Sequence, residues 1–310
     1  MFLIGDIGGT KVHLAYFDQD RLVKEEKFRS RHFKDLSEIL EKFLDRPVQK
    51  SYLAVAGPVQ DRKCLMTNLS WEIDADRLEK RHRIGKVYLI NDLAASGWGL
   101  RRLKPQDIFT LNTGVQESGN QAVIAAGTGL GIGGLYWDGK NHIPFPSEGG
   151  HVDFAPRDAF DRQLWDYLHK KYGHVSLERI ISGPGLEHLY WFLVEKGKHK
   201  KILEGEEIPK LVIEHALSGE STACQEALRW FVSLYGAAAG NTALQFLSKG
   251  GLYLAGGIAP KILKVLQQGE FMKAFADKGR FQELLLKIPV HVVLNENLPT
   301  LGALECSLRN

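Results

Sequence analysis

Two aspartates of this sequence stand where an active-site carboxylate is expected. Asp6 comes after the apolar run at 2–4 and just before a glycine-rich turn, and Asp92 follows Asn91 at the end of the apolar run at 86–90. In open α/β sheets, ligand-binding groups gather where strands end and helices begin. Asp6 could orient a hydrated Mg²⁺ beside phosphate groups. For Asn91 and Asp92 the alternative is a helix N-cap, a position that both residue types favour.

Three glycine-rich segments form a second kind of candidate site. An apolar strand, a glycine turn with a threonine and a second strand follow one another at 2–17 and again at 122–137, and Gly256-Gly257 follows a third apolar run. Glycine permits positive φ and leaves backbone N–H groups uncovered, so successive amides can converge on a phosphate. The hydroxyls of Thr10 and Thr128 add donors. The alternative is that these turns are tight hairpins and bind nothing.

The match between the first two segments indicates a weak internal repeat, in which each half contributes one phosphate-facing hairpin. Two better known phosphate motifs do not fit. Residues 129–134 satisfy G-x-G-x-x-G, but a strand with Trp137 and an Asp138-Gly139 hairpin turn follow, where a dinucleotide-binding loop must open a helix. Gly8-Gly9-Thr10-Lys11 lacks the spacing of a Walker A loop.

The elements around these residues alternate between strands and helices. Apolar residues with helical spacing predict an amphipathic helix over 36–44, and buried strands are expected at 51–56 and 86–90. Further along, helices are expected at 176–181 and 229–247, the second with small residues that let backbones pack closely. This alternation is typical of an α/β fold in which helices cover a sheet.

Length and composition set the class of protein. The 310 residues suggest about two domains, and a composition of 44% hydrophobic and 25% charged residues excludes a disordered or fibrous chain. Lys and Arg number 40 against 37 Asp and Glu. The resulting net charge of +3 is too weak to imply a nucleic-acid or membrane partner.

The cysteines and the first residues predict the compartment. Cys64, Cys224 and Cys306 lie far apart and form no CxxC pair, which favours neither a zinc knuckle nor a disulfide framework. The run at 2–4 meets Gly5-Asp6 too early for a signal peptide, and no stretch approaches the roughly 18 apolar residues of a membrane span. We therefore expect a soluble protein of the cytoplasm.

The three glycine-rich segments, each after a strand, resemble the ATPase core shared by sugar kinases, actin and the heat-shock chaperone ATPases. That resemblance implies an actin-like (ribonuclease H-like) α/β fold of two domains with a cleft between them. More specifically, the chain resembles the bacterial glucokinases from Met1 to about Gly302. The motifs that carry this likeness are Asn91-Asp92, Ser147-Glu148-Gly149-Gly150-His151-Val152-Asp153-Phe154, Gly173-His174-Val175-Ser176-Leu177-Glu178-Arg179 and Ser182-Gly183-Pro184-Gly185.

The resemblance to bacterial glucokinases implies a role for each motif. The first two glycine hairpins would cradle the phosphates of ATP and the third would lie by the adenosine. The implied nucleotide-binding residues are Gly5, Asp6, Ile7, Gly8, Gly9, Thr10, Gly127, Thr128, Gly129, Gly256 and Gly257, with Asp6 meeting Mg²⁺ through water. Asp92 is implied to be the base on the 6-hydroxyl of the sugar. The implied sugar-binding residues are Asn91, Asp92, Glu148, His151, Glu178 and Asn68.

Metal ligation is the competing interpretation of two of these segments. Glu148 and His151 have the E-x-x-H spacing, but the intervening glycines argue against the helix that such a pair needs. His174 and Glu178 are four residues apart, yet no cysteine completes a zinc set. Sugar-binding repressor–kinase relatives carry a cysteine-rich zinc motif beside the sugar histidine. This chain lacks it, which favours the glucokinase branch.

The implied activity is ATP-dependent phosphorylation of glucose to glucose 6-phosphate, with Mg²⁺, by a cytoplasmic homodimer. A small α/β domain is expected at 1–104, completed by a C-terminal helix at about 301–310, with a large α/β domain at 105–300. The alternatives are a kinase for another hexose, a kinase using polyphosphate, and a non-catalytic sugar sensor on the same fold. A silent sensor would be expected to lose the base, whereas Asp92 is present.

Overall fold

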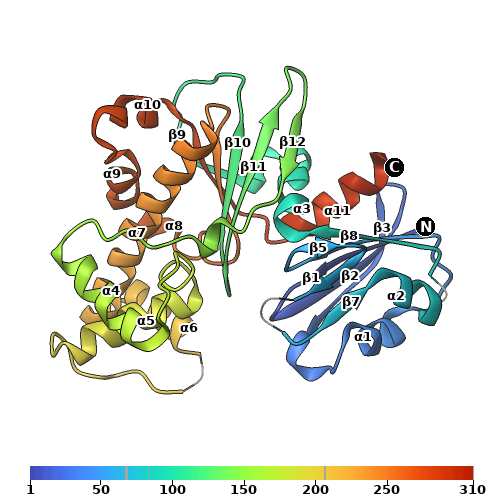
Figure 1. Cartoon of the computed structure of the whole chain (residues 1–310), viewed down its shortest axis with the longest axis horizontal. Helices are drawn as coiled ribbons and strands as arrows, with labels where there is room; N and C mark the ends of the chain where they lie inside the picture. Colours follow the sequence, from blue (N-terminus) through green and yellow to red (C-terminus); the bar gives the residue numbers. More distant parts are fainter. Residues whose placement is uncertain (67–68, 83, 206, 310) are drawn as a thin grey trace. The chain divides into compact units, whose positions relative to one another are not determined.

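The chain forms two compact units in a computed structural model that describes residues 1–66, 69–82, 84–205 and 207–309 (Figure 1). Unit 1 comprises Met1–Lys104, Ile143–Pro146 and Asn297–Asn310, and unit 2 comprises Pro105–His142 and Ser147–Glu296. The chain therefore leaves unit 1 after Lys104, returns to it for Ile143–Pro146, and returns again for its last helix.

A five-stranded sheet forms the centre of unit 1. Its order is β3-β2-β1-β4-β8, with β1 at Phe2–Ile7, β2 at Lys11–Asp18, β3 at Arg21–Arg29, β4 at Lys50–Val55 and β8 at Lys86–Asn91. β1 pairs antiparallel with β2 but parallel with β4, and β4 pairs parallel with β8. The carboxyl ends of β1, β4 and β8 therefore meet at one edge of the sheet.

Helices cover both faces of this sheet. Alternate residues of a strand point to opposite sides, so each face has its own apolar residues to pack against a helix. On one face, Leu3 of β1 shares a buried cluster with Ile39 of α1 (Leu36–Phe43). On the other face, Ile4 packs with Ala303 of α11 (Leu298–Arg309). The amphipathic helix expected at 36–44 is confirmed and ends one residue earlier.

The remaining elements of unit 1 are short. A second, three-stranded sheet consists of β5 (Val59–Gln60), β6 (Lys63–Leu65) and β7 (Glu72–Asp74), and the helices are α2 (Ala75–His82) and α3 (Asp92–Gly99). The strands expected at 51–56 and 86–90 are β4 and β8, shifted by one residue at an end.

Unit 2 is built on a second sheet with the order β12-β11-β10-β13-β14-β9. The strands of this sheet are β9 (Ile108–Asn112), β10 (Gln121–Ala126), β11 (Leu130–Trp137), β12 (His142–Phe145), β13 (Leu252–Ala255) and β14 (Val290–Val293). Of β12, residues 143–145 are counted in unit 1. β10 pairs antiparallel with β11 and parallel with β13, which pairs parallel with β14. The sheet of unit 1 has the same pattern. The repeat that the matched glycine turns indicated is therefore confirmed as a repeat of topology.

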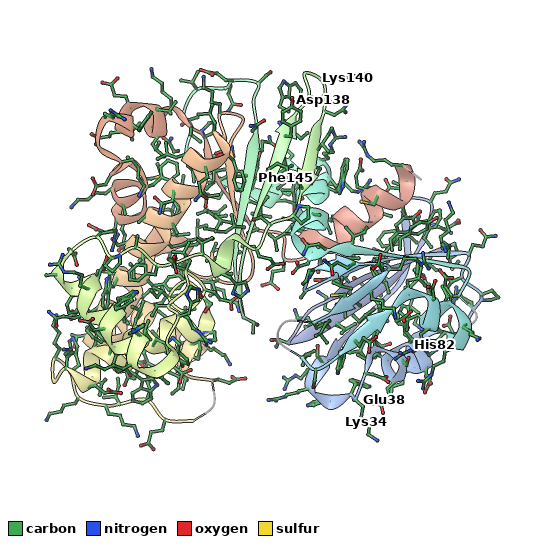
Figure 2. The ribbon with its side chains drawn as sticks, viewed as in Figure 1. Lys34, Glu38, His82, Asp138, Lys140 and Phe145 are labelled. Carbon is green, nitrogen blue, oxygen red and sulfur yellow. The ribbon has the colours of Figure 1, made fainter. Side chains whose placement is uncertain are left out.

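The hairpin of β11 and β12 turns at Asp138-Gly139, as expected. The carboxylate of Asp138 accepts hydrogen bonds from the backbone N–H groups of Lys140 and Asn141, at 2.7 and 2.6 Å. Figure 2 labels Asp138 and Lys140 at the tip of this hairpin. Gly139 has a φ of 98°, which glycine adopts at no steric cost.

Seven helices complete the part of unit 2 that the structure describes. They are α4 (Ala159–Tyr172), α5 (Gly183–Glu195), α6 (Ile208–Ser218), α7 (Thr222–Phe246), α8 (Leu263–Leu266), α9 (Glu270–Ala276) and α10 (Gln282–Lys287). A Cβ at Gly236 or Gly240 of α7 would meet the carbonyl oxygens of Phe271 and Phe275 in α9. Small residues of α7 therefore do let two backbones approach closely, as predicted.

None of the helices in the described residues, the 25-residue α7 included, is both long and apolar enough to cross a membrane.

The prediction of a helix at 176–181 is wrong. Ser176 forms a β-bridge with Asp153, and the N–H of Glu178 donates to the carbonyl oxygen of Gly150. Only a single turn follows before α5 begins. Pairing with a segment more than twenty residues away overrides the local preference for a helix, because propensity differences of less than about 1 kcal/mol per residue are easily outweighed.

Helices α3 and α11 approach each other backbone to backbone. A Cβ at Gly302 would meet the carbonyl oxygen of Ala95, and a Cβ at Gly99 would meet the carbonyl oxygen of Leu298. Both glycines are therefore required by the close contact. As a consequence, α11 holds in place the helix that begins with Asp92.

We expect Gly302→Ala to lower the free energy of unfolding by about 1–3 kcal/mol, because the added methyl group must displace the backbone of α3. Alanine is otherwise the better helix former by about 1 kcal/mol, so a loss of stability isolates the effect of packing. Denaturant unfolding followed by tryptophan fluorescence measures it. Gly257→Ala is the control, because no atom lies within 4 Å of a Cβ there. Equal stability of Gly302→Ala and wild type would contradict the expected effect.

Candidate active site

One edge of the sheet in unit 1 gathers three of the predicted site residues. In the register of the parallel strands, Asp6 lies beside Ala54 and Ala54 lies beside Ile90. Asn91 and Asp92 follow directly. Neighbouring strands are about 4.8 Å apart, so roughly 10 Å separates β1 from β8. Asp6 and Asp92, far apart in the sequence, therefore share one edge of one sheet.

Asn91 is the N-cap of α3, so the capping interpretation holds for this residue. Its side-chain oxygen accepts from the backbone N–H groups of Leu93 and Ala94 at 3.0 and 3.2 Å. Its amide nitrogen donates to the carbonyl oxygen of Gly57 at 3.2 Å. Because a carboxamide has two N–H groups, capping the helix is compatible with donating to a sugar hydroxyl.

Asp92 is the first residue of α3 and is partly exposed. One of its carboxylate oxygens accepts from the N–H of Leu93 at 2.9 Å, and its main-chain oxygen accepts from the hydroxyl of Ser96 at 2.8 Å. A negative charge is favourable in the first turn of a helix. The local structure therefore orients this carboxylate and favours its ionised form, the form that a base requires.

The first glycine hairpin is held in shape by Ser30, which follows β3. The hydroxyl of Ser30 donates to the carbonyl oxygen of Gly8 at 2.9 Å, and its N–H donates to the carbonyl oxygen of Thr10 at 3.1 Å. Thr10 is exposed at the tip, within reach of an anion. Sequence analysis missed Ser30, since nothing in the local sequence links a serine after β3 to a turn about twenty residues earlier.

Gly5 and Ile7 lie within β1 rather than in the turn. A Cβ at Gly5 would come within 2.7 Å of Leu53 Cδ2 and 3.0 Å of Leu14 Cδ2. Ile7 is fully buried in the cluster on the α1 side of the sheet. Packing of the sheet is enough to account for both residue types.

Asp6 is partly buried on the side of the sheet that carries Ile4 and α11. Burial raises the pKa of its carboxyl group to about 6, while the positive charges of Lys11 and Lys27 lower it. The group is therefore mostly ionised at neutral pH. Its oxygens are of the kind that Mg²⁺ prefers.

Among the described residues, no three His, Cys, Asp or Glu side chains lie close enough to form a metal cluster. A Mg²⁺ at this edge would therefore depend on Asp6 together with phosphate oxygens and water. That is how Mg²⁺ is usually held in phosphoryl-transfer sites.

In unit 2, the second and third glycine segments follow neighbouring strand ends. β10 and β13 are parallel, with Ala125 beside Ala255, so the turn at 127–129 lies near Gly256-Gly257. Gly256 has a φ of 81°, and a Cβ there would meet the main chain of Ala126. Both facts require glycine. Thr128 is exposed in the turn, as Thr10 is in unit 1.

Backbone pairing also brings together the implied sugar-binding residues of unit 2. The N–H of Glu178 donates to the carbonyl oxygen of Gly150 at 2.9 Å, within the turn that carries Glu148 and His151. Glu148 Oε2 lies 3.9 Å from His151 Nε2, and both side chains are about half exposed. The backbone of Glu178 is therefore joined to the turn that carries Glu148 and His151. Two carboxylates and an imidazole suit a polyol, whose hydroxyls both donate and accept.

Two other predictions for this region have different outcomes. His174 contacts the carboxylate of Asp153 at 3.3 Å and the carbonyl oxygen of His151 at 3.1 Å, so it supports the turn rather than pairing with Glu178 around a metal. Asn68 lies outside the described residues.

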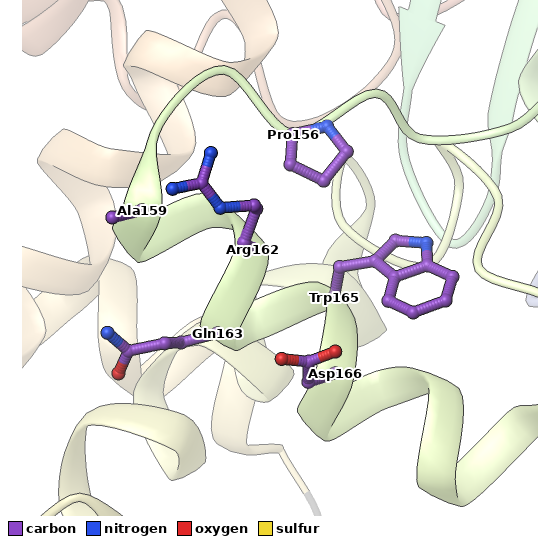
Figure 3. Close-up of a pocket in the computed structure, with 6 residues that line it drawn as sticks. All are labelled: Pro156, Ala159, Arg162, Gln163, Trp165 and Asp166. Carbon is purple, nitrogen blue, oxygen red and sulfur yellow. The ribbon is translucent and has the colours of Figure 1, made fainter.

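A cavity of about 500 Å³ lies on unit 2 at α4 and the segment before it (Figure 3). Its lining residues are Pro156, Ala159, Arg162, Gln163, Trp165 and Asp166. None of the predicted site residues is among them. Within each unit, the predicted groups stand at strand ends and turns rather than in this hollow.

Comparisons with known proteins cover the whole chain. A family model described as glucokinase matches residues 3–309. A glucokinase from Nostoc sp. is 39% identical, over 100% of this chain and 99% of the relative. The crystal structure of a glucokinase from an Antarctic psychrotroph has a TM-score of 0.80 at 30% identity, covering 100% of this chain and 99% of that one. The crystal structure of a ROK family glucokinase from Streptomyces griseus, in complex with glucose and AMPPNP, has a TM-score of 0.68. It covers 100% of this chain and 99% of that one at 19% identity, so the similarity is one of fold.

Asp6 should make the stability of the metal-free protein depend on pH. Its folded pKa of about 6 lies above its usual value of 3.8, so the folded state binds this proton more tightly than the unfolded state. The resulting stabilisation is complete below about pH 4 and is lost as pH rises through 6. Relative to Asp6→Asn, wild type should therefore lose on the order of 2–3 kcal/mol between pH 4 and pH 7.

Denaturant unfolding of both proteins in EDTA at several pH values measures this difference. Groups other than Asp6 titrate alike in the two proteins, so their contributions cancel. A stability difference that stays constant from pH 4 to pH 7 would show that the Asp6 pKa is not raised.

Proposed function

The chain belongs to the glucokinase family and has the actin-like ATPase fold, and we propose that it transfers the terminal phosphoryl group of ATP to the 6-hydroxyl of glucose. One observation carries the assignment of residues: Asp92 begins α3 at the same sheet edge that presents Asp6. Phosphoryl transfer needs a carboxylate for the attacking hydroxyl and a group that orients the phosphates. In unit 1, Asp92 is proposed for the first role and Asp6 for the second.

The residues proposed to bind the sugar are Glu148, His151, Glu178 and Asn91. Their carboxylate, imidazole and amide groups offer the mixture of acceptors and donors that a hexose requires. Hydrogen bonds to charged groups are worth roughly 1.5–3 kcal/mol, enough for about ten- to hundredfold discrimination at one hydroxyl. These residues would therefore set the preference for glucose over its epimers.

Asp92 is proposed to accept the proton of the 6-hydroxyl as its oxygen attacks the terminal phosphorus of ATP. The new bond joins the sugar oxygen to phosphorus, and the bond between phosphorus and the bridging oxygen of ADP breaks. The hydrogen bond from the Leu93 N–H fixes one carboxylate oxygen. The first turn of α3 therefore sets the orientation of the Asp92 carboxylate.

The phosphates are proposed to lie against the amides of the turns at 8–10 and 127–129, with the hydroxyls of Thr10 and Thr128 as further donors. Gly256-Gly257 would lie by the adenosine. Mg²⁺, when bound, neutralises phosphate charge and orients the phosphates. The partly buried carboxylate of Asp6 is the group of this chain that would hold it, through water.

We further propose that unit 1 and unit 2 act as the small and large domains of the enzyme. A homodimer and a location in the cytoplasm are implied by the resemblance to bacterial glucokinases, and both stay predictions. So does the expectation that neither nucleic acid nor membrane is a partner. The Asp92 carboxylate at the sheet edge favours an enzyme over a silent sugar sensor.

A coupled assay of ADP release tests the proposed function. With ATP and Mg²⁺, we expect glucose to exceed mannose, fructose and N-acetylglucosamine in kcat/KM by about tenfold or more, because each misplaced hydroxyl costs a charged hydrogen bond. EDTA should abolish the activity. Formation of glucose 6-phosphate with polyphosphate but not with ATP, followed directly as the sugar phosphate, would identify polyphosphate as the phosphoryl donor. Binding of glucose with no turnover from either donor would identify a sensor instead.

Asp92→Asn should lower kcat by roughly 10²–10⁴, the usual loss when a general base is removed. The asparagine preserves the size of the side chain and the hydrogen bond from the Leu93 N–H, so the affinity for glucose should change little. Steady-state kinetics give kcat, and calorimetric titration gives the glucose affinity as a control for folding. A variant whose kcat stays within about threefold of wild type would remove Asp92 from the role of base.

A further inference from the structure

Glu178 has a contact that its role in sugar binding does not explain. Its Oε2 accepts a hydrogen bond from the backbone N–H of Leu130 at 2.9 Å. Leu130 is the first residue of β11 and pairs with Ala126, the last residue of β10. These two residues close the turn at 127–129. One carboxylate oxygen of Glu178 is therefore hydrogen-bonded to the base of the hairpin that is predicted to bind phosphate.

Further contacts tie the segment around Glu178 to the same hairpin. The N–H of Gly183 donates to the carbonyl oxygen of Gly127 at 2.8 Å. A Cβ at Gly150, whose carbonyl oxygen binds the N–H of Glu178, would meet the carbonyl oxygen of Leu130. The turn that carries Glu148 and His151 thus approaches the base of the hairpin backbone to backbone, and the Glu178 carboxylate is a side chain that hydrogen-bonds to that base.

We propose that Glu178 positions the phosphate hairpin at 127–129, so that the affinity of the protein for nucleotide depends on this residue even when no sugar is present. The proposal rests on the proposed function, because it takes the hairpin to bind the phosphates of ATP. Glu178 is in this respect a positioning residue. Its Oε2 holds the hairpin through Leu130, which leaves Oε1 as the oxygen proposed to accept from the sugar.

The hydrogen-bonding capacity of the side chain separates the two tasks. Leu130 is 5% exposed, so its N–H has little access to water if the carboxylate is removed. Glutamine keeps one oxygen that accepts from this N–H but loses the charge and the second acceptor. Alanine keeps neither. The two substitutions at one position should therefore have different effects on nucleotide and on sugar.

Calorimetric titration with Mg·AMPPNP in the absence of sugar tests the proposal. For Glu178→Ala, we expect the Kd for AMPPNP to rise about fivefold or more, as for loss of one charge-assisted hydrogen bond. For Glu178→Gln, it should stay within about twofold of wild type, whereas the Kd for glucose should rise about tenfold. His151→Ala is the matched control: it removes a proposed sugar-binding side chain that lies 3.9 Å from Glu148 Oε2, and should leave the AMPPNP affinity unchanged.

Three results would overturn the proposal: wild-type nucleotide affinity in Glu178→Ala, equal losses of nucleotide affinity in the alanine and glutamine variants, or the same loss in His151→Ala. If Glu178→Ala does not fold, as judged by its thermal transition, Glu178→Asp replaces it, because its carboxylate is one methylene too short to reach Leu130. Activity of the wild type towards glucose is measured separately. A failure of this proposal is therefore distinct from a failure of the proposed function.

Discussion

Parallel pairing of strands decides where the chemical groups of this protein can act. In unit 1, the pairing of β1, β4 and β8 carries Asp6 and Asp92 to one sheet edge. In unit 2, the pairing of β10 and β13 carries the turn at 127–129 to the side of Gly256-Gly257. In both sheets the antiparallel neighbour of the first strand supplies the glycine hairpin. The same topology, used twice, thus presents two sets of backbone amides suited to phosphate.

Close backbone contacts make this arrangement possible. Gly302 allows α3 to pack closely against α11, and Gly256 allows the chain after β13 to pack closely against Ala126. Gly150 allows the turn at 148–151 to pack closely against Leu130. In each case an added Cβ would meet a main-chain atom, which cannot move without moving a strand or a helix. The geometry of the candidate site therefore depends on positions that carry no functional group.

Several polar groups of the candidate site also make structural hydrogen bonds. Asn91 caps α3 with its oxygen while its amide is oriented by Gly57. Glu178 has the same dual character, because one of its oxygens is bonded to the main chain. Structural hydrogen bonds of this kind restrict the side chains before any substrate binds. Such pre-organisation reduces the cost of ordering the site during the reaction.

The sequence by itself determined the strands that flank the glycine turns, the two buried strands β4 and β8, the amphipathic helix α1 and, through its motifs, the family to which the chain belongs. These are local properties, read from periodicity and residue type over a few positions. The tertiary structure decided that 176–181 forms a bridge rather than a helix, that Ser30 holds the first hairpin, and that Glu178 reaches Leu130. Each of these depends on a hydrogen bond between segments distant in the sequence, and neither partner carries a local signal of the other.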